Sequence, residues 1–242
     1  MRVKTNLNTR ALLLFIAPMV LIFSNAFADT KKDSIERAFM VRLEYPAGKP
    51  GWGISSYGTA WKLYDRYLVT NKHVALACAG SKICNKTLVD IDGHEYPFEV
   101  FGVSYNFDVA IIKALTAIPG KDAIISSRPT SLGQSVYSIG FPKEVFTEST
   151  NCNIKEYLED GTVTDCFVNP GASGSALYNN SSEVIGLVFA QGLDPNSIVN
   201  GDYSKARRLE HVQYSIPSTI LIQEIDLILK GPSVIEGYPG AK

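Results

Sequence analysis

The chain has 242 residues, of which 45% are hydrophobic and 19% are charged, and its formal net charge is −1. This length suits one large domain or two small ones with a substantial core. The nearly balanced charge, without any Lys/Arg-rich run, argues against nucleic acid as a natural partner.

The first 28 residues have the pattern of an export signal. Arg2, Lys4 and Arg10 precede an apolar run (residues 11–23), and Ala-Phe-Ala at 26–28 supplies a small-x-small cleavage pattern. Because the run is shorter than the roughly 20 residues of a transmembrane helix, we expect cleavage and no stable membrane insertion, with an uncleaved anchor as the alternative. Cleavage removes three basic residues and no acidic one, so the net charge changes from −1 to −4. The mature chain is then expected in the periplasm or outside the cell.

Most of the remaining chain reads as short strands separated by Gly, Pro, Asn and Asp. β-branched and aromatic residues, mostly alternating with polar ones, predict strands at 39–44, 58–61, 66–70, 87–91, 98–103, 109–113, 135–140, 184–190 and 212–216. Residues 115–130 lack a clear period and form the natural linker between two halves. Many short strands with a single terminal helix predict an all-β fold of the barrel or sandwich class.

The one helical pattern lies at the end of the strand-rich region. Ser218 is the expected cap, Ile222, Ile225 and Leu229 form the expected apolar face, and Gly231-Pro232 ends the helix.

The sequence contains four cysteines: Cys78, Cys84, Cys152 and Cys166. An even number in an exported chain suggests disulfides, and four cysteines allow three pairings. Short loops close at low entropic cost, which favours Cys78–Cys84 and Cys152–Cys166. A zinc site is the alternative, but no C-x-x-C occurs, so we expect neither a metal nor another cofactor.

The stretch "VNPGASGSAL" (168–177) places Ser173 in a turn built from glycines and a proline. Gly171 and Gly174 permit a positive φ and close backbone approach, and Pro170 fixes φ, so together they predict a tight turn. A surface turn that happens to contain serines is the simpler interpretation. A nucleophilic serine would need a nearby base and a carboxylate that orients it.

Three histidines and one aspartate are candidate partners for the serine. His94 lies in a polar turn and His211 heads a strand, and both are interpreted as surface residues. His73 follows an apolar strand and precedes a short helical patch, so it is the best candidate base. Asp108 begins an apolar strand, where a buried carboxylate would need a donor such as an imidazole N–H.

Five stretches in order resemble trypsin-like serine peptidases, closest to the HtrA/Deg and glutamyl-endopeptidase branches. The resemblance covers roughly residues 35 to 230. The stretches are "GTAW…YLVTNKHV", "DGHEYPFEVFGVSYNFDVAIIKA", "LGQSVYSIGFP", "GTVTDCFVNPGASGSALYNNSSEVIGLVFA" and "VQYSIPSTIL".

The resemblance implies two antiparallel six-stranded β-barrels and a C-terminal α-helix. Residues 29–120 would form the barrel with His73 and Asp108, residues 121–217 the barrel with Ser173, and residues 218–242 the helix and tail. Ser173 would be the nucleophile, His73 the base, and Asp108 the residue that fixes the imidazole. The N–H groups of Gly171 and Ser173 would form the oxyanion hole. A side chain at position 171 would crowd the substrate, and Gly174 would let the following strand pass closely.

Two departures from trypsin concern the residues before the serine. Ala172 replaces the aspartate that pairs with a newly cut N-terminus, so no trypsin-style zymogen switch is expected. Phe167 replaces the acidic residue that selects basic substrates, although Asp165 lies two positions earlier. The expected pocket residues are Phe167, Pro170, Val188, Ala190 and Ser215. Their apolar character predicts small or medium hydrophobic substrate side chains.

Two further expectations concern segments outside the motifs. HtrA/Deg proteins normally continue into a PDZ domain, but this chain ends at Lys242, so control by a PDZ domain is not expected. The polar insertion at 191–210 is interpreted as a floppy surface loop, with a specificity loop as the alternative.

The expected function is therefore a serine endopeptidase acting on proteins or peptides, and the sequence leaves its oligomeric state open. An α/β-hydrolase esterase could use Ser173, Asp194 or Asp202, and His211, but Ser175 breaks the G-x-S-x-G motif and the strand-rich pattern disfavours that class. A catalytically inactive binding module of the same fold is the main alternative.

Overall fold

The computed structural model describes residues 31–44, 56–79, 84–198 and 202–231. The predicted export signal and the end of the C-terminal tail lie outside these ranges. In the described part of the chain, no helix has both the length and the apolar character that crossing a membrane would require.

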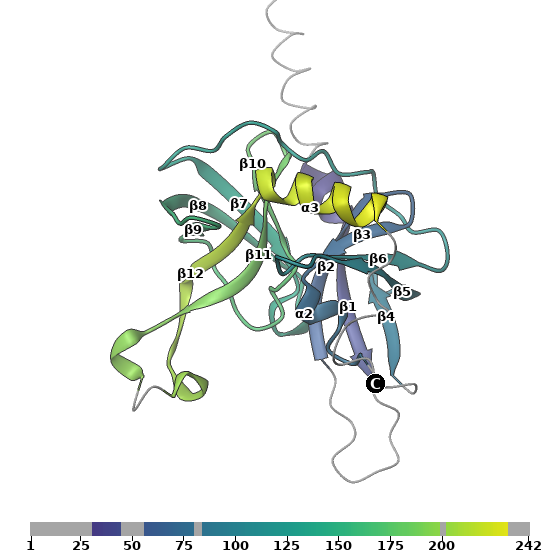
Figure 1. Cartoon of the computed structure of the whole chain (residues 1–242), viewed down its shortest axis with the longest axis horizontal. Helices are drawn as coiled ribbons and strands as arrows, with labels where there is room; N and C mark the ends of the chain where they lie inside the picture. Colours follow the sequence, from purple (N-terminus) through teal and green to yellow (C-terminus); the bar gives the residue numbers. More distant parts are fainter. Residues whose placement is uncertain (1–30, 45–55, 80–83, 199–201, 232–242) are drawn as a thin grey trace, which may run out of the picture.

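Twelve strands form two closed antiparallel barrels, as the resemblance predicted (Figure 1). The first barrel has the strand order β1-β2-β3-β6-β5-β4 and the second β10-β11-β12-β9-β8-β7. The first comprises β1 (Ala38–Glu44), β2 (Ser56–Tyr64), β3 (Tyr67–Thr70), β4 (Asn85–Val89), β5 (Glu95–Val103) and β6 (Ala110–Ala114). The second comprises β7 (Ser135–Gly140), β8 (Thr147–Tyr157), β9 (Thr162–Thr164), β10 (Ala176–Asn179), β11 (Val184–Leu193) and β12 (Arg208–Pro217).

Two α-helices and three short 3₁₀ turns connect or close these strands. Helix α2 (Lys72–Ala75) follows β3, and α3 (Ser218–Lys230) follows β12. A helical segment over residues 31–36 precedes β1. The 3₁₀ turns are Pro142–Glu144, Pro195–Ser197 and Tyr203–Lys205.

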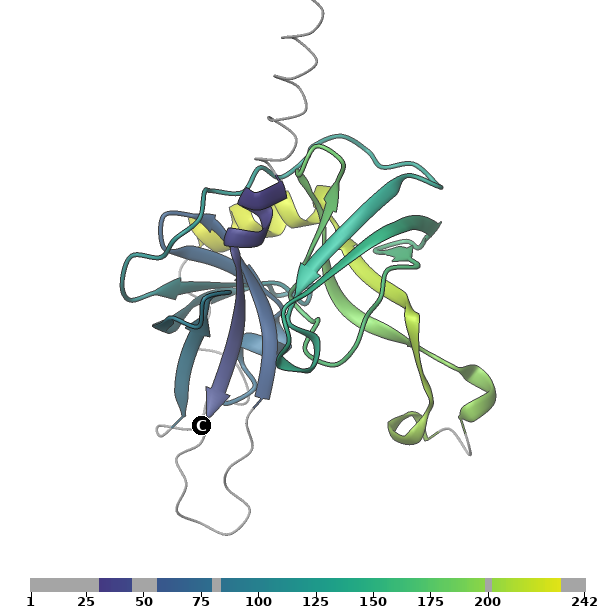
Figure 2. The same ribbon diagram turned by 180° about the vertical axis from the view of Figure 1, so that it is seen from behind.

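Because side chains alternate between the two faces of a strand, one strand can contribute residues to two different cores. In β1, Phe39 and Val41 face the interior of the first barrel, whereas Ala38 and Met40 belong to a core that also contains residues of the second barrel. The barrels are therefore joined by a shared apolar interface, and this interface fixes their relative position. Figure 2 shows the two barrels side by side.

Three strands escaped the sequence prediction, and β8 shows why. Its eleven residues are mostly polar, and its buried side chains are separated by exposed ones at irregular intervals. Asn151 has a φ of 57°, which interrupts the alternation within the strand. β9 and β10, with three and four residues, are too short to show a period.

Helix α3 lies where the sequence placed it, but its cap and buried face differ from expectation. Pro217 occupies the N-cap position and no side chain caps the helix, so Ser218 is its first residue. The buried apolar residues are Leu221, Ile225 and Ile228, whereas Ile222 is 38% exposed. The helix packs on β5 and β6 of the first barrel and on β11 and β12 of the second (Figure 1).

Both disulfide pairings favoured by sequence proximity are present. Cys78–Cys84 closes a loop of the first barrel, and Cys152–Cys166 ties β8 to the segment after β9. Cys152 and Cys166 are buried in the interior core of the second barrel.

Candidate active site

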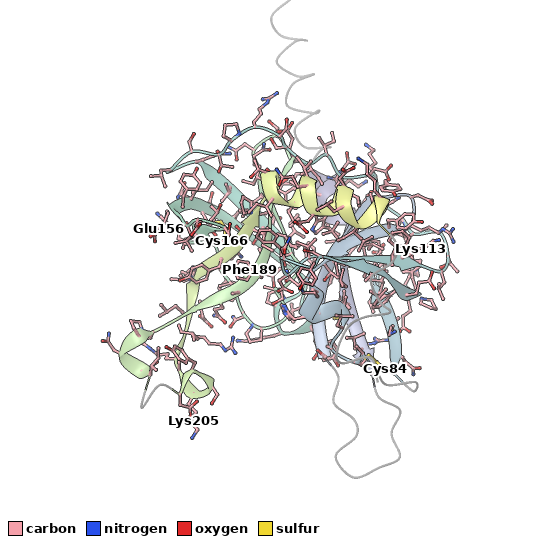
Figure 3. All side chains as sticks on the ribbon, in the orientation of Figure 1. Cys84, Lys113, Glu156, Cys166, Phe189 and Lys205 are labelled. Carbon is pink, nitrogen blue, oxygen red and sulfur yellow. A yellow bond between two sulfur atoms is a disulfide. The ribbon has the colours of Figure 1, made fainter. Side chains whose placement is uncertain are left out.

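Three connections between strands bring the predicted catalytic residues to the seam between the barrels, that is, the interface that the two barrels share. His73 lies on α2, Asp108 lies in the connection between β5 and β6, and Ser173 lies in the turn between β9 and β10. His73 and Ser173 line the same cavity. Phe189, which lines this cavity too, is labelled near the seam in Figure 3.

His73 and Asp108 are joined by two hydrogen bonds. Asp108 Oδ2 lies 2.6 Å from His73 Nδ1, and Asp108 Oδ1 accepts from the His73 main-chain N–H at 2.9 Å. Burial alone would raise the pKa of Asp108. The hydrogen bonds from His73 and the charges of His73 and Lys72 outweigh burial and lower this pKa below its usual value. Asp108 is therefore ionised at neutral pH, and its carboxylate favours the tautomer with a proton on Nδ1.

The residues just before His73 also hold the Asp108 loop. Asn71 Nδ2 donates to the Asp108 carbonyl at 2.8 Å, and Lys72 Nζ donates to the Ser104 carbonyl at 2.9 Å. Three consecutive residues, 71–73, thus contact the same loop, which fixes the distance between the imidazole and the carboxylate.

The serine turn is held by a threonine of the first barrel. The Thr59 N–H donates to the Ser173 carbonyl at 2.8 Å. Its hydroxyl donates to the Gly171 carbonyl at 2.9 Å and accepts from the Phe141 N–H at 3.0 Å. Thr59 is fully buried. Sequence reasoning missed this residue, because a threonine within a strand carries no distinguishing signal.

The two glycines of the turn have the expected positive φ, but the groups that approach them closely differ from those expected. Gly171 and Gly174 have φ values of +98° and +90°, which other residues rarely adopt. A Cβ at position 171 would lie 2.7 Å from the Phe141 carbonyl oxygen, so the crowding involves the protein itself. A Cβ at position 174 would lie 1.9 Å from the Thr59 carbonyl oxygen, so the strand that passes closely is β2 of the first barrel.

The turn leaves two amide groups without a backbone acceptor. Within the described part of the chain, the N–H groups of Ala172 and Gly174 donate to the carbonyls of Asn169 and Val188, whereas those of Gly171 and Ser173 have no backbone partner. Backbone N–H groups of a turn that lack a backbone acceptor can bind an anion or a developing negative charge.

The cavity beside Ser173 has a volume of about 280 Å³. Of the predicted pocket residues, Pro170, Val188 and Ala190 line it. Phe167 instead packs edge-on against the His211 ring, and Ser215 is buried with its hydroxyl directed to the Thr162 carbonyl. Val168, Asn169, Phe189 and Gln191 line it too and lie within the predicted walls, which were residues 167–170, 187–192 and 214–218. The lining residues outside those walls, besides the catalytic candidates, are Leu193, Tyr203 and Arg208.

In its described residues, 191–198 and 202–210, the insertion begins as an extension of the β11–β12 hairpin, where an irregular surface loop was the expectation. β11 and β12 continue into it and pair up to Leu193 and Arg208. Asp194 and Arg207 then close it through a backbone hydrogen bond of 2.7 Å and a side-chain contact of 2.7 Å. We call residues 191–210 the hairpin arm; Figure 3 labels Lys205 near its far end. Tyr203 and Arg208 of the arm line the cavity, as a specificity element would.

The remaining predicted residues lie away from the cavity lining. Asp165 is bound by Lys155 Nζ at 2.7 Å and by the Asn153 N–H at 2.5 Å. His211 is exposed, and its Nδ1 lies 3.3 Å from the Asp165 carbonyl oxygen. Ala172 is buried against apolar neighbours, where an aspartate would have stood in trypsin.

The alternative esterase set has other roles in the structure. Asp194 is paired with Arg207, and Asp202 accepts hydrogen bonds from the backbone and side chain of Ser204. Each aspartate caps a 3₁₀ turn of the hairpin arm.

One group of side chains in the described residues could hold a metal ion. Possible ligand atoms of Asp90, Asp92 and His94 lie within 4.8 Å of one another in the β4–β5 turn. The Asp90 carboxylate already accepts from the N–H groups of Asp92 and His94 and from the Tyr96 hydroxyl. These bonds account for the turn without a metal.

Comparison with known proteins places this geometry in context. The model of a family described as "Trypsin-like peptidase domain" matches residues 53–187, more than half of the chain. A protein of Chlamydia pneumoniae named "Probable periplasmic serine endoprotease DegP-like" is 28% identical over 187 residues, covering 73% of this chain and 35% of that protein. "Serine endoprotease DegS" of Haemophilus influenzae is 25% identical over 193 residues, covering 74% of this chain and 51% of that protein. The chain thus spans about a third to a half of these relatives' length.

Solved structures share the fold at low sequence identity. The active form of the Rv3671c protease from M. tuberculosis superposes with a TM-score of 0.65 at 19% identity, covering 85% of this chain and 86% of that chain. The HtrA-type protease AlgW with a tripeptide gives 0.66 at 20% identity, covering 84% and 64%.

Proposed function

Because the chain belongs to the family of trypsin-like peptidases, we propose that it is a serine endopeptidase that uses Ser173, His73 and Asp108. The observation that carries the proposal is the His73–Asp108 pair beside a cavity that Ser173 also lines. Peptide-bond hydrolysis is the reaction that this set of groups performs elsewhere in the family.

In the proposed mechanism, Ser173 Oγ attacks the carbonyl carbon of the scissile peptide bond. His73 donates a hydrogen bond from Nδ1–H to Asp108, so Nε2 is the free base that accepts the Ser173 proton. Nε2 gives this proton to the leaving amine when the C–N bond breaks and the acyl-enzyme forms. Water then attacks the acyl carbon and loses a proton to Nε2, which returns it to Ser173 Oγ as the acyl C–O bond breaks and the carboxylic acid leaves.

The free amide groups of Gly171 and Ser173 are the proposed oxyanion hole. They are the two N–H groups of the turn without a backbone acceptor among the described residues. Each such donor contributes about 3–4 kcal/mol to transition-state stabilisation in enzymes of this type. Thr59 supports this role because it binds the carbonyl groups of the same two residues.

The cavity favours small or medium hydrophobic side chains of the substrate. Phe189, Ala190 and Leu193 are the partly exposed apolar residues of its lining, which also contains the polar residues Asn169, Gln191 and Arg208. The Gln191 side chain, on β11, donates through Nε2 to the Val168 carbonyl at 2.8 Å and so joins two segments that line the cavity. We propose that this bond limits the depth that a substrate side chain can reach.

The proposed setting is the periplasm or the extracellular space, with proteins or peptides as substrates. Support comes from the export-type N-terminus, the two disulfides, and relatives whose names include "periplasmic". We propose domain boundaries after residues 28, 120 and 217; the strand ranges of the two barrels and the start of α3 support the last two.

The proposal is tested with a serine-reactive fluorophosphonate probe and a peptide library. We expect the wild type to be labelled and Ser173→Ala to be unlabelled, with a loss of about 10⁶-fold in kcat. Ser175→Ala, in the same turn, is the matched control and keeps the label. A folded wild type that takes no label would contradict the proposal and favour the inactive binding module.

A further inference from the structure

The buried face of α3 contains a carboxylate. Glu224 is only 6% exposed, although acidic side chains are rarely buried without a partner. Its Oε2 accepts a hydrogen bond of 2.6 Å from the hydroxyl of Ser104, which lies 120 positions earlier and is 2% exposed. The last helix of the chain is thereby bonded to a loop of the first barrel.

Ser104 begins the loop that carries Asp108, and its N–H, carbonyl and hydroxyl groups all make hydrogen bonds. Its hydroxyl accepts from the Phe107 N–H at 2.9 Å, and its own N–H donates to the Val109 carbonyl at 2.8 Å. Its carbonyl accepts from Lys72 Nζ. Ser104 therefore links three features: α3, the Asp108 loop and the residue preceding the catalytic-base candidate.

The packing around Glu224 indicates that the carboxylate is kept for its hydrogen bond. Leu221, Ile225 and Ile228 of the same face supply the apolar contacts of α3. A Cβ at Gly102 would lie 2.6 Å from Ile228 Cγ2, so the helix approaches β5 as closely as a glycine permits. Burying an apolar residue at position 224 would cost less free energy than burying a carboxylate. An apolar residue, however, could not accept the hydrogen bond from the Ser104 hydroxyl.

We propose that Glu224 and Ser104 are positioning residues that hold the Asp108 loop at the distance His73 requires. The inference rests on the proposed function, because the position of Asp108 affects turnover only if Asp108 orients His73. Asn71 and Lys72 hold the loop from the side of the first barrel, and Glu224 holds it from the side of α3.

The test compares Glu224→Ala, Glu224→Gln and Ser104→Ala. Asp226→Ala is the matched control, because Asp226 is exposed on the same helix and pairs with Lys230 at 2.7 Å. Two readouts are needed: kcat and KM on a peptide substrate, and the low-field NMR resonance of the His73 Nδ1 proton in a Ser173→Ala background. The NMR signal reports the His73–Asp108 bond without requiring catalysis.

We expect Glu224→Ala and Ser104→Ala to lower kcat by on the order of 10- to 100-fold with little change in KM, since misplacement by about 1 Å has effects of this size. The low-field resonance should broaden or disappear in both. Glu224→Gln keeps an acceptor oxygen and should restore kcat and the resonance. The double variant Ser104→Ala/Glu224→Ala should have a kcat no lower than that of the more impaired single variant.

Two outcomes would overturn the inference. One is a folded Ser104→Ala protein with wild-type kcat and an unchanged resonance, a measurement that stands even if Glu224→Ala fails to fold. The other is a folded Glu224→Gln protein as impaired as Glu224→Ala. Failure of the proposed function looks different, because the wild type itself would then show no turnover while the resonance still responded to the substitutions.

Discussion

At the scale of single residues, the site consists of a predictable set and a supporting set without a sequence signal. Ser173, His73 and Asp108 could be singled out because glycines, strand ends and their order along the chain mark them. Thr59 and Glu224 could not, since one reads as an ordinary strand residue and the other as a polar position of an amphipathic helix. Both act through contacts to residues more than 100 positions away, and local patterns do not record such contacts.

Thr59 offers a test of how the serine turn is held. Thr59→Val keeps the shape but removes the hydroxyl, leaving the Phe141 N–H buried without its acceptor. We expect a loss of about 1–3 kcal/mol in unfolding free energy and a fall in kcat on the order of 10-fold or more, because the Gly171 peptide is released. Thr59→Ser keeps the hydroxyl and should stay within a few-fold of wild type. Thermal unfolding and steady-state kinetics measure both effects; equal kcat for the two variants would exclude the role of the hydroxyl.

At the scale of elements, a strand could be predicted from the sequence when it was long enough and had a regular pattern of buried side chains. β7 matched its predicted bounds because its six residues contain a run of five buried ones. β8, although paired on both sides within its barrel, carries no strand signal because it is mostly polar and has few buried side chains. The Asp, Asn, Ser and Gly content of the hairpin arm is typical of a loop. The interaction that orders it, between Asp194 and Arg207, joins residues whose pairing depends on the register of β11 and β12.

The element-scale prediction concerns Gln191, where β11 enters the hairpin arm. Gln191→Ala removes a side chain that lines the cavity and bonds to the Val168 carbonyl, so larger substrate side chains should fit. We expect the ratio of kcat/KM for aromatic over small aliphatic side chains to rise by roughly 10-fold or more. Cleavage-site profiling of a peptide library measures this ratio. Arg207→Ala, on the same arm but paired with Asp194, is the control; an unchanged ratio in Gln191→Ala would mean that Gln191 does not set the depth.

At the scale of the whole molecule, the barrels share one apolar interface and α3 spans both of them. The site lies on this interface: Thr59 of the first barrel holds the serine turn of the second, and α3, following the second barrel, holds the Asp108 loop of the first. The two-barrel architecture was predictable from the resemblance, but the exchange of supports between the halves was not.

Folding stability should decrease in acid, because several carboxyl groups have lowered pKa values. In Asp108 and Asp90, burial opposes ionisation, but hydrogen bonds from His73, and from His94 and Tyr96, lower the pKa of each. Their stabilising contribution is present above the unfolded pKa of about 3.9 and is lost as the pH falls through the lower folded values. Urea unfolding followed from pH 6 to pH 2 should show a falling midpoint. Asp90→Asn should weaken this dependence, and a midpoint that stays constant would contradict the contribution of these carboxylates.

The bonds by which Thr59 holds the serine turn and Glu224 holds the Asp108 loop have a consequence for the newly made chain. A polypeptide that has completed only its N-terminal half has the imidazole and the carboxylate but no nucleophile. Until the last helix returns to the first half, the aspartate loop lacks one of its anchors. Under the proposed chemistry, peptide-cleaving capacity therefore arises late, after both halves have docked.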